Sequence, residues 1–441
     1  MSRPSVQSLD SPPMGDRLME LCRELYPLHR SLTGEGVRAT LRRLARIAPI
    51  EIRSLPSGWP ILDWTVPREW HVEEAYIRSP HGERIADVQT HTLHLVGYSA
   101  PFEGTVDRTE LDRHLHSLPE HPDWIPYRTS YWRETWGFCV PHRVRASLPE
   151  GRYQVVVRTR LDPSGVMNWG ELVIPGRGAR EILVTTHICH PSMANDNCSG
   201  MAVAAYLAAE WTRRADAQHT VRFLFLPGTV GAIAWLALHR AVVPRIRHVL
   251  VLAGLGDPGP LTLKHSRTGD REVDRVPRRT AAQLALELQE RPFTPYGYDE
   301  RQFASPGIRL PTIVLSRTPF GEYPEYHTSA DNLDFIRADA LNESYQFVLR
   351  VLTALDAARH PVNVMPFGEP QLGRRGLYGS LGGRSHVRDD QLAMLWVLNQ
   401  ADGDHSVDDI VEQSGLPRER IERALAALEQ HGLIRWLEAP S

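Results

Sequence analysis

EILVTTHICHPSMANDNCSGMAVAAYLAAEW, residues 181–211, joins an apolar run to an apolar helical pattern through a loop of small and polar residues. The run ends at His187, and the loop ends at Gly200. A near-continuous apolar strand followed directly by a helix is typical of a mainly parallel sheet with helices on both faces. Ligands of such sheets bind beyond the carboxyl ends of the strands, so we look for chemistry in the loop after His187.

The same alternation of strand and helix continues from Leu172 to about Ala357 and predicts an α/β fold. The expected strands are residues 181–187, 220–227, 247–256 and 312–318, and the expected helices are residues 201–215, 232–241, 280–291 and 338–358. Apolar spacing over residues 16–47 adds two N-terminal helices, separated by the turn SLTGEG.

The remaining segments differ in character from this core. Residues 50–160 alternate short apolar runs with Pro/Gly turns and predict a β-rich inserted subdomain, with one helix near residues 108–118. We therefore assign residues 16–49 and 161–365 to the core. Residues 1–15 are expected to be a disordered leader, residues 366–387 a linker, and residues 388–441 a winged-helix domain of three helices and a wing.

Composition narrows the function classes. The 441 residues carry a formal net charge of -3 and 42% hydrophobic residues, which is ordinary for a globular protein. The four cysteines form no CxxC pair, the N-terminus lacks an apolar signal core, and no apolar run approaches the roughly 20 residues of a membrane span. We expect a cytoplasmic protein with no membrane partner.

The winged-helix segment is acidic. From Arg388 to Ser441 it holds five arginines and eleven acidic residues. Phosphate backbones require the opposite sign, so we expect no nucleic-acid partner and assign this domain to packing or protein interaction.

Three segments contain residue types that bind metals or move protons. His187 and Asp196 lie at one strand end, and an imidazole with a carboxylate suits zinc. His327 lies in PEYHTSADNLDF, residues 324–335. Asp299 and Glu300 lie in PYGYDERQFASPGIRLP, residues 295–311. Each also has a structural explanation: a hydrogen-bonded histidine, a helix N-cap, or a solvated charged turn.

Taken together, these segments resemble the zinc aminopeptidase superfamily, which also contains the glutaminyl cyclases. More closely, residues 18–437 resemble a bacterial family of aminopeptidase-like proteins with a winged-helix tail, often encoded beside polysaccharide-biosynthesis genes. The resemblance rests on the blocks RSLTGEG, DWTVPREW, IPYRTSYW, WGFC, CHPSMANDN, EYHTSADNLDF and QLGRRGLYG. It implies that His187, Asp196 and His327 bind zinc.

The chain departs from the superfamily pattern at three places. Gly228 and Thr229 occupy the place of two glutamates, a general base and a metal ligand. The acidic ligand expected at the end of the strand RHVLVLAGLG is out of register, with Asp257 a few residues on, and Cys189 replaces an aspartate that orients a histidine. With two carboxylate ligands missing, we expect one zinc ion per chain at an open three-ligand site.

Three functions remain open at this stage. The first is a zinc-dependent amide hydrolase of aminopeptidase type, acting on a small peptide or aminoacyl conjugate, with Asp299, Glu300 or His190 supplying the missing base. The second is a zinc enzyme for cyclisation or acyl transfer in small-molecule or glycan biosynthesis. The third is a catalytically inactive metal-containing binding protein. The oligomeric state, including a homo-oligomer, is also open.

Overall fold

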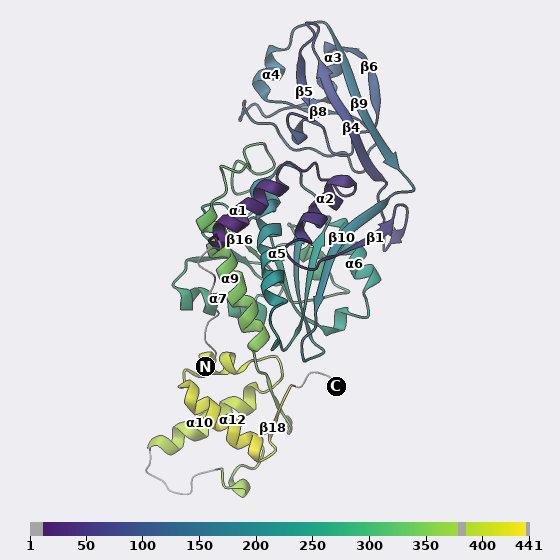
Figure 1. Ribbon diagram of the computed structural model, residues 1–441. Helices are drawn as coiled ribbons and strands as arrows, with labels where there is room; N and C mark the ends of the chain where they lie inside the picture. Colours follow the sequence, from purple (N-terminus) through teal and green to yellow (C-terminus); the bar gives the residue numbers. More distant parts are fainter. Residues whose placement is uncertain (1–11, 378–384, 438–441) are drawn as a thin grey trace.

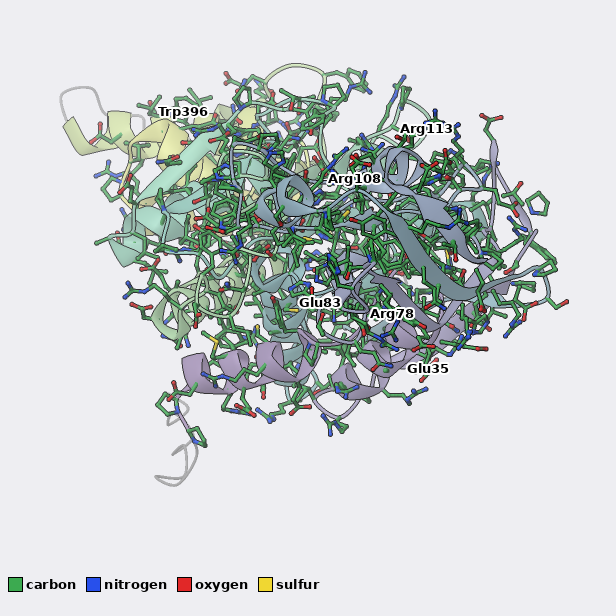
Figure 2. All side chains as sticks on the ribbon, turned by 90° about the horizontal axis from the view of Figure 1, so that it is seen from above. Glu35, Arg78, Glu83, Arg108, Arg113 and Trp396 are labelled. Atoms are coloured by element: carbon green, nitrogen blue, oxygen red, sulfur yellow. The ribbon has the colours of Figure 1, made fainter. Side chains whose placement is uncertain are left out.

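The computed structural model describes residues 12–377 and 385–437 and contains three units (Figure 1). A β-rich unit and the winged helix lie at opposite ends of a central α/β core. Figure 2 looks down on the β-rich unit, where Arg78 and Arg108 are labelled, and Trp396 marks the winged helix beyond it. Among the described helices, none is long and apolar enough to cross a membrane.

The core is built on an eight-stranded sheet whose inner strands are parallel. In spatial order its strands are β1 (Glu51–Pro56), β10 (Val166–Ile174), β12 (Thr220–Leu226), β11 (Glu181–His187), β13 (Ile246–Leu252), β16 (Thr312–Ser316), β14 (Leu261–Lys264) and β15 (Leu288–Arg291). Every residue of β11 and β13 is buried, as expected for strands covered on both faces. The predicted fold class is confirmed.

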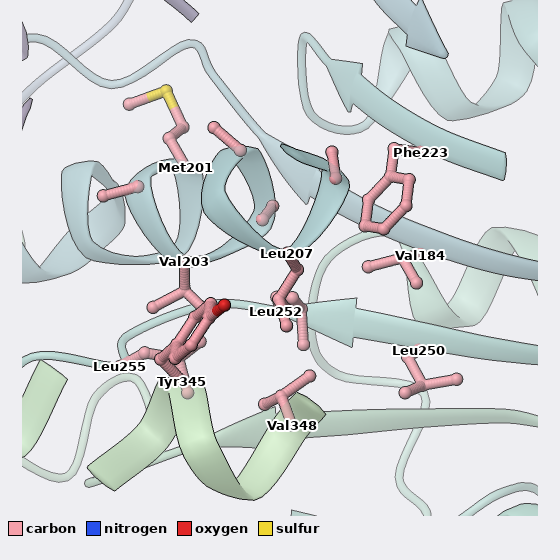
Figure 3. Close-up of a cluster of buried hydrophobic side chains, with 14 of the residues drawn as sticks. Val184, Met201, Val203, Leu207, Phe223, Leu250, Leu252, Leu255, Tyr345 and Val348 are labelled. Carbon is pink, nitrogen blue, oxygen red and sulfur yellow. The ribbon is translucent and has the colours of Figure 1, made fainter. Parts of the chain in front are cut away.

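Helices cover both faces of this sheet. The helices of the core are α1 (Met14–Leu25), α2 (Glu35–Leu44), α5 (Gly200–Trp211), α6 (Val230–Leu238), α7 (Glu272–Leu284), α8 (Glu300–Phe303) and α9 (Ala338–Ala357). Helix α5 is apolar on all sides because it lies between the sheet and α1 and α9. In Figure 3, Val203 and Leu207 of α5 meet Tyr345 and Val348 of α9 beside strand residues of the sheet.

The β-rich unit is a four-stranded antiparallel sheet with two short helices. Its strands, in spatial order, are β5 (Arg84–Asp87), β4 (Glu69–Arg78), β9 (Arg152–Asp162) and β6 (Phe102–Asp107), and its helices are α3 (Arg108–His114) and α4 (His142–Ser147). Short pairs β2 (Pro60–Ile61) with β3 (Trp64–Thr65) and β7 (Leu115–His116) with β8 (Phe138–Cys139) complete the connections.

The winged helix contains α10 (Ser385–Gln400), α11 (Val407–Ser414), α12 (Arg418–Gln430) and a wing, β18 (Ile434–Trp436). The wing pairs with β17 (Pro361–Asn363), and Leu372 packs in the same hydrophobic core. The unit therefore starts near residue 360, whereas the sequence pattern predicts that the α/β core runs to residue 365 and that the winged helix starts at residue 388. Residues 378–384 of the expected linker lie outside the described residues.

Other differences have a physical reason. Strand β1 belongs to the central sheet and not to the inserted unit, because its backbone pairs with β10. The predicted helix over residues 280–291 is wrong in its second half: Ala285 takes a left-handed φ of 52°, and residues 288–291 pair with β14. Sheet pairing overrides local helix propensity there. Residues 1–11 of the expected leader are not described, and α1 already begins at Met14.

Candidate metal centre

His187 and Asp196 are brought together at the carboxyl end of β11. His187 is the last residue of the strand, and Asp196 lies in the turn Ala194–Ser199 that leads into α5. The Nε2 atom of His187 lies 2.7 Å from Oδ1 of Asp196, and both side chains are buried. The position is the one that the parallel-sheet rule predicts for a ligand site.

His327 reaches the same carboxylate from the loop before α9. Its Nε2 atom lies 3.0 Å from Oδ2 of Asp196, so the two carboxylate oxygens face one histidine each. The backbone of His327 is left-handed, with φ of 57°, and its carbonyl accepts a 2.8 Å hydrogen bond from the Tyr127 N–H. About 30% of its side chain is exposed, which makes this the accessible side of the cluster.

His190 is a fourth donor in this cluster. Its ring lies 4.9 Å from the ring of His187 and 5.0 Å from that of His327. Ligand atoms of His187, His190 and Asp196 all lie within 4.8 Å of one another. Burial lowers the pKa of His190 well below its usual value, so its imidazole is in the neutral form that binds metal. From the sequence, His190 is predicted as a candidate base and not as a metal ligand.

Imidazole nitrogens with one carboxylate form a donor set that suits zinc. The side chains present therefore fit the ion that the resemblance implies: His187, His190 and Asp196 offer ligand atoms within 4.8 Å of one another, and His327 lies on the other oxygen of Asp196. Within the described residues, no second group of three or more such side chains is found.

The loop that presents Asp196 is held by Asp331. The N–H groups of Asn195 and Asp196 donate to the two oxygens of Asp331 at 2.6 and 2.9 Å. The amide of Asn197 donates to the His187 carbonyl at 3.1 Å. These contacts fix the direction of both ligands, a role that outer groups play at most metal sites. The motif YHTSAD contained Asp331, but its partner lies 135 residues earlier and spacing alone could not reveal it.

Tyr298 completes the inner surface of the site. Its hydroxyl donates to Oδ2 of Asp196 at 3.3 Å and lies 3.2 Å from Nε2 of His327. Its ring stacks on His187 with the ring centres 4.5 Å apart. No local pattern in the sequence marks Tyr298, although it lies directly before the acidic pair Asp299 and Glu300.

Asp299 lies beside Gly228, on the His187 side of the cluster. A Cβ atom built on Gly228 would lie 3.8 Å from Oδ1 of Asp299 and 3.2 Å from the Cβ atom of His187. Asp299 is buried, and neither of its carboxylate oxygens has a hydrogen-bond partner among the described residues. Burial raises the pKa of this carboxyl to about 7, and the nearby His187 acts against that rise.

Unlike Asp299, three other residues singled out from the sequence have structural partners: Glu300, Cys189 and Asp257. Glu300 pairs with Lys264 at 2.7 Å and accepts the Tyr298 N–H at 2.9 Å. The Cys189 thiol, whose pKa burial raises to about 12, lies 3.7 Å from Nδ1 of His190 and from the Gly228 carbonyl. Asp257 accepts from the Asn195 amide at 3.0 Å and does not replace the missing metal ligand.

Comparison with known proteins identifies the family and the fold of this chain. Residues 19–358 match the model of a family described as a domain of unknown function, DUF4910, and residues 359–436 match a winged helix-turn-helix model. The chain belongs to the DUF4910 family. A relative from Clostridium acetobutylicum, named for polysaccharide biosynthesis and an aminopeptidase-like domain, is 40% identical to this DUF4910 chain over 421 residues, or 96% of each protein.

Solved structures of known proteins share the fold of this chain. A crystal structure from Clostridium acetobutylicum, titled as a peptidase, is 38% identical and superposes on the DUF4910 chain with a TM-score of 0.81 over 96% of both chains. A zinc aminopeptidase from Bacillus subtilis is 14% identical and superposes with a TM-score of 0.57 over 78% of this chain and 96% of its own. The DUF4910 domain therefore has the fold of the zinc aminopeptidases.

Proposed function

We propose that this DUF4910 protein is a zinc-dependent amide hydrolase of aminopeptidase type, acting on a short peptide or aminoacyl conjugate, with Asp299 as its general base. The observation that carries the proposal is the position of Asp299. Its unpartnered carboxylate lies beside Gly228, at the end of β12 where the superfamily has its glutamate base. Asp299, which directly precedes α8, thus lies close to the position that a glutamate side chain at residue 228 would occupy.

His187, Asp196 and His327 would hold one zinc ion, with His190 close enough to serve as a fourth donor. Zinc, when bound, supplies Lewis-acid polarisation of an amide carbonyl and makes water more acidic. Four imidazole and carboxylate groups suffice for a single ion, whereas a second ion would need further carboxylates.

In the proposed reaction, Asp299 accepts a proton from the attacking water as the new carbon–oxygen bond forms. It then returns that proton to the nitrogen of the leaving amine as the carbon–nitrogen bond breaks. The Tyr298 hydroxyl lies within 3.3 Å of both Asp196 and His327, where it would donate a hydrogen bond to the developing oxyanion.

We also propose that the protein works in the cytoplasm, because all four cysteines are buried free thiols, as a reducing compartment allows. Its substrate would be a small molecule, with no nucleic acid or membrane as partner, and either a monomer or a homo-oligomer is compatible with such a site.

The test compares Asp299→Asn with Glu300→Gln, two neighbouring acid-to-amide changes. Hydrolysis of an aminoacyl-amide and dipeptide panel by the zinc-loaded protein should fall by about 100-fold or more in Asp299→Asn, with zinc content unchanged. Glu300→Gln should keep kcat within about tenfold and lower the melting temperature, since it breaks the pair with Lys264.

Incorporation of oxygen from labelled water into the product distinguishes hydrolysis from cyclisation or acyl transfer. Full activity in Asp299→Asn would refute Asp299 as base. No turnover of any amide by the zinc-loaded wild type would favour the inactive binding protein.

A further inference from the structure

A cationic cleft lies where the α/β core meets the winged helix, at the end of the sheet opposite the metal centre. It has a volume of about 510 Å³, within the range of small-molecule sites. Arg180 directly precedes β11, and Arg247 lies in β13 near its start, so both belong to the amino ends of the parallel strands. His187 ends β11 at its other end, about 20 Å away at 3.3 Å per residue.

Positive charge dominates this cleft. Two aspartates, Asp216 and Asp356, line it together with five arginines, Arg177, Arg180, Arg214, Arg247 and Arg359. The Asp356 carboxylate already accepts hydrogen bonds from the backbone N–H groups of Gln218 and His219, at 3.0 and 2.8 Å. The whole chain carries a net charge of -3, so this concentration of arginines is local.

Several of these guanidinium groups have no anionic partner. The side chains of Arg177 and Arg180 make no hydrogen bond or ion pair in the described part of the chain. Arg214 donates to the Thr353 hydroxyl at 3.1 Å and lies over the Trp211 ring at 4.4 Å, but has no anionic partner there. Burial and the charge of Arg247 lower the pKa of Arg180, and Asp404 acts against this. Unpaired, mutually repelling guanidinium groups in a concave site favour a bound anion.

The opposite wall of the cleft comes from the junction of the two units. Ala357 ends α9 and Ala358 follows it, while Trp436 ends the wing and Leu437 follows it. Arg359 lies over the Trp436 ring at 4.6 Å and pairs with Glu422 of α12 at 2.6 Å. A ligand in the cleft would touch the core and the winged helix at once.

We propose that this cleft binds a small phosphorylated molecule with at least two phosphoryl charges, held by Arg177, Arg180 and Arg214. Guanidinium groups match phosphoryl oxygens with paired hydrogen bonds, and several arginines around one cavity select a multiply charged group over a single one. Binding would tie the winged helix to the core, far from the metal centre.

Isothermal titration of the full chain with inorganic pyrophosphate tests the proposal, with orthophosphate as the weaker probe. We expect saturable binding of one pyrophosphate per chain, at least tenfold tighter than orthophosphate, and a rise in melting temperature. Arg177→Ala and Arg180→Ala should each weaken binding about tenfold. Arg177 is exposed, so its change leaves folding intact.

Arg213→Ala is the matched control, because Arg213 lies next to Arg214 but is exposed and pairs with Glu210. It should bind pyrophosphate as the wild type does. Equal affinities in the Arg177, Arg180 and Arg213 variants would overturn the proposal, as would absence of binding at millimolar pyrophosphate. Tighter binding of a 20-base-pair duplex, lost in the same variants, would assign the arginines to nucleic acid and overturn it too.

Discussion

Asp299 and Glu300 are adjacent in the sequence but lie in different surroundings. Glu300 turns toward Lys264, and its charge is neutralised there. Asp299 turns toward Gly228 and His187 and has no partner of its own. A buried carboxyl without hydrogen bonds costs free energy of folding, so its retention next to a metal-type cluster points to a use in chemistry.

Zinc stoichiometry is the first prediction at this scale. Protein purified without chelator should contain about one zinc ion per chain, because one cluster of imidazoles and a carboxylate is present. His190→Ala should weaken zinc affinity by roughly 10- to 100-fold, measured by competition with a chromophoric chelator. His81→Ala, at an exposed turn, serves as the control. A reproducible content of two ions would contradict the single-ion site.

The second prediction at this scale concerns the substitution Gly228→Glu. Gly228 has no left-handed φ, so a side chain meets no backbone penalty, but its Cβ atom would press against His187 at 3.2 Å. The added carboxylate would also stand next to Asp299. We therefore expect lower zinc affinity and no gain in hydrolysis, and Gly228→Ala should show a smaller loss of the same kind. A tenfold gain in aminopeptidase activity would show that the base was missing.

At the scale of elements, the contact between α7 and α11 joins the core to the winged helix. Asp409 of α11 is fully buried and accepts from Arg275 and Arg279 of α7 at 2.8 and 2.6 Å. The same carboxylate caps α11 through the Ser406 N–H. The Asp409 side chain thus caps the start of α11 and also holds α11 against α7.

Acid should loosen this contact. Burial acts to raise the pKa of Asp409, but hydrogen bonds from Arg275, Ser406 and Arg279 hold it at about 2. A carboxyl with a lowered folded-state pKa stabilises the fold above its unfolded pKa of 3.8, and this stabilisation, about 2 kcal/mol, is lost as the pH falls from about 4 to 2. Calorimetric unfolding of Asp409→Asn should show a loss of similar size at pH 7 and a flatter dependence on pH over this window.

Asp408→Asn provides the comparison, since Asp408 lies on the exposed side of α11 and pairs with Arg418. Its effect should stay within about 0.5 kcal/mol. An equal loss of unfolding free energy in both variants would contradict this prediction, because the buried Asp409 would then stabilise the fold no more than the exposed Asp408.

The strands were easier to predict than the contacts between them. The strands ending at His187 and Leu226 contain the apolar stretches ILV and FLFL and could be located from the sequence alone. The half-exposed segment at residues 288–291 could not, because it is a strand only through pairing with β14. Likewise, His187 and Asp196 were found from local patterns, whereas the roles of Tyr298 and Asp331 depend on contacts across more than 100 residues.

At the scale of the whole molecule, charge decides what the winged helix can bind. The arginines of α12 are paired within the domain: Arg418 with Asp408, and Arg420 with Asp389 at 3.0 Å. Few cations remain on this domain to displace counterions from DNA.

We therefore predict no measurable binding of random duplex DNA at physiological salt. Fluorescence anisotropy with a labelled duplex, repeated at low salt, checks this, and a winged-helix protein with a basic recognition helix serves as the positive control. A submicromolar affinity that falls steeply with salt would contradict the prediction.

The hydrogen bonds from residues 195 and 196 to Asp331 also determine when this loop can take its final position during synthesis of the chain. The strand that carries His187 leaves the ribosome more than 100 residues before Asp331 and His327 do. At 5–20 residues per second, this leaves roughly 5–30 seconds in which the nascent chain has His187, His190 and Asp196 but neither Asp331 nor His327. If the cluster binds zinc as proposed, the complete site can form only near the end of translation of the core, when Asp331 can accept the hydrogen bonds from residues 195 and 196.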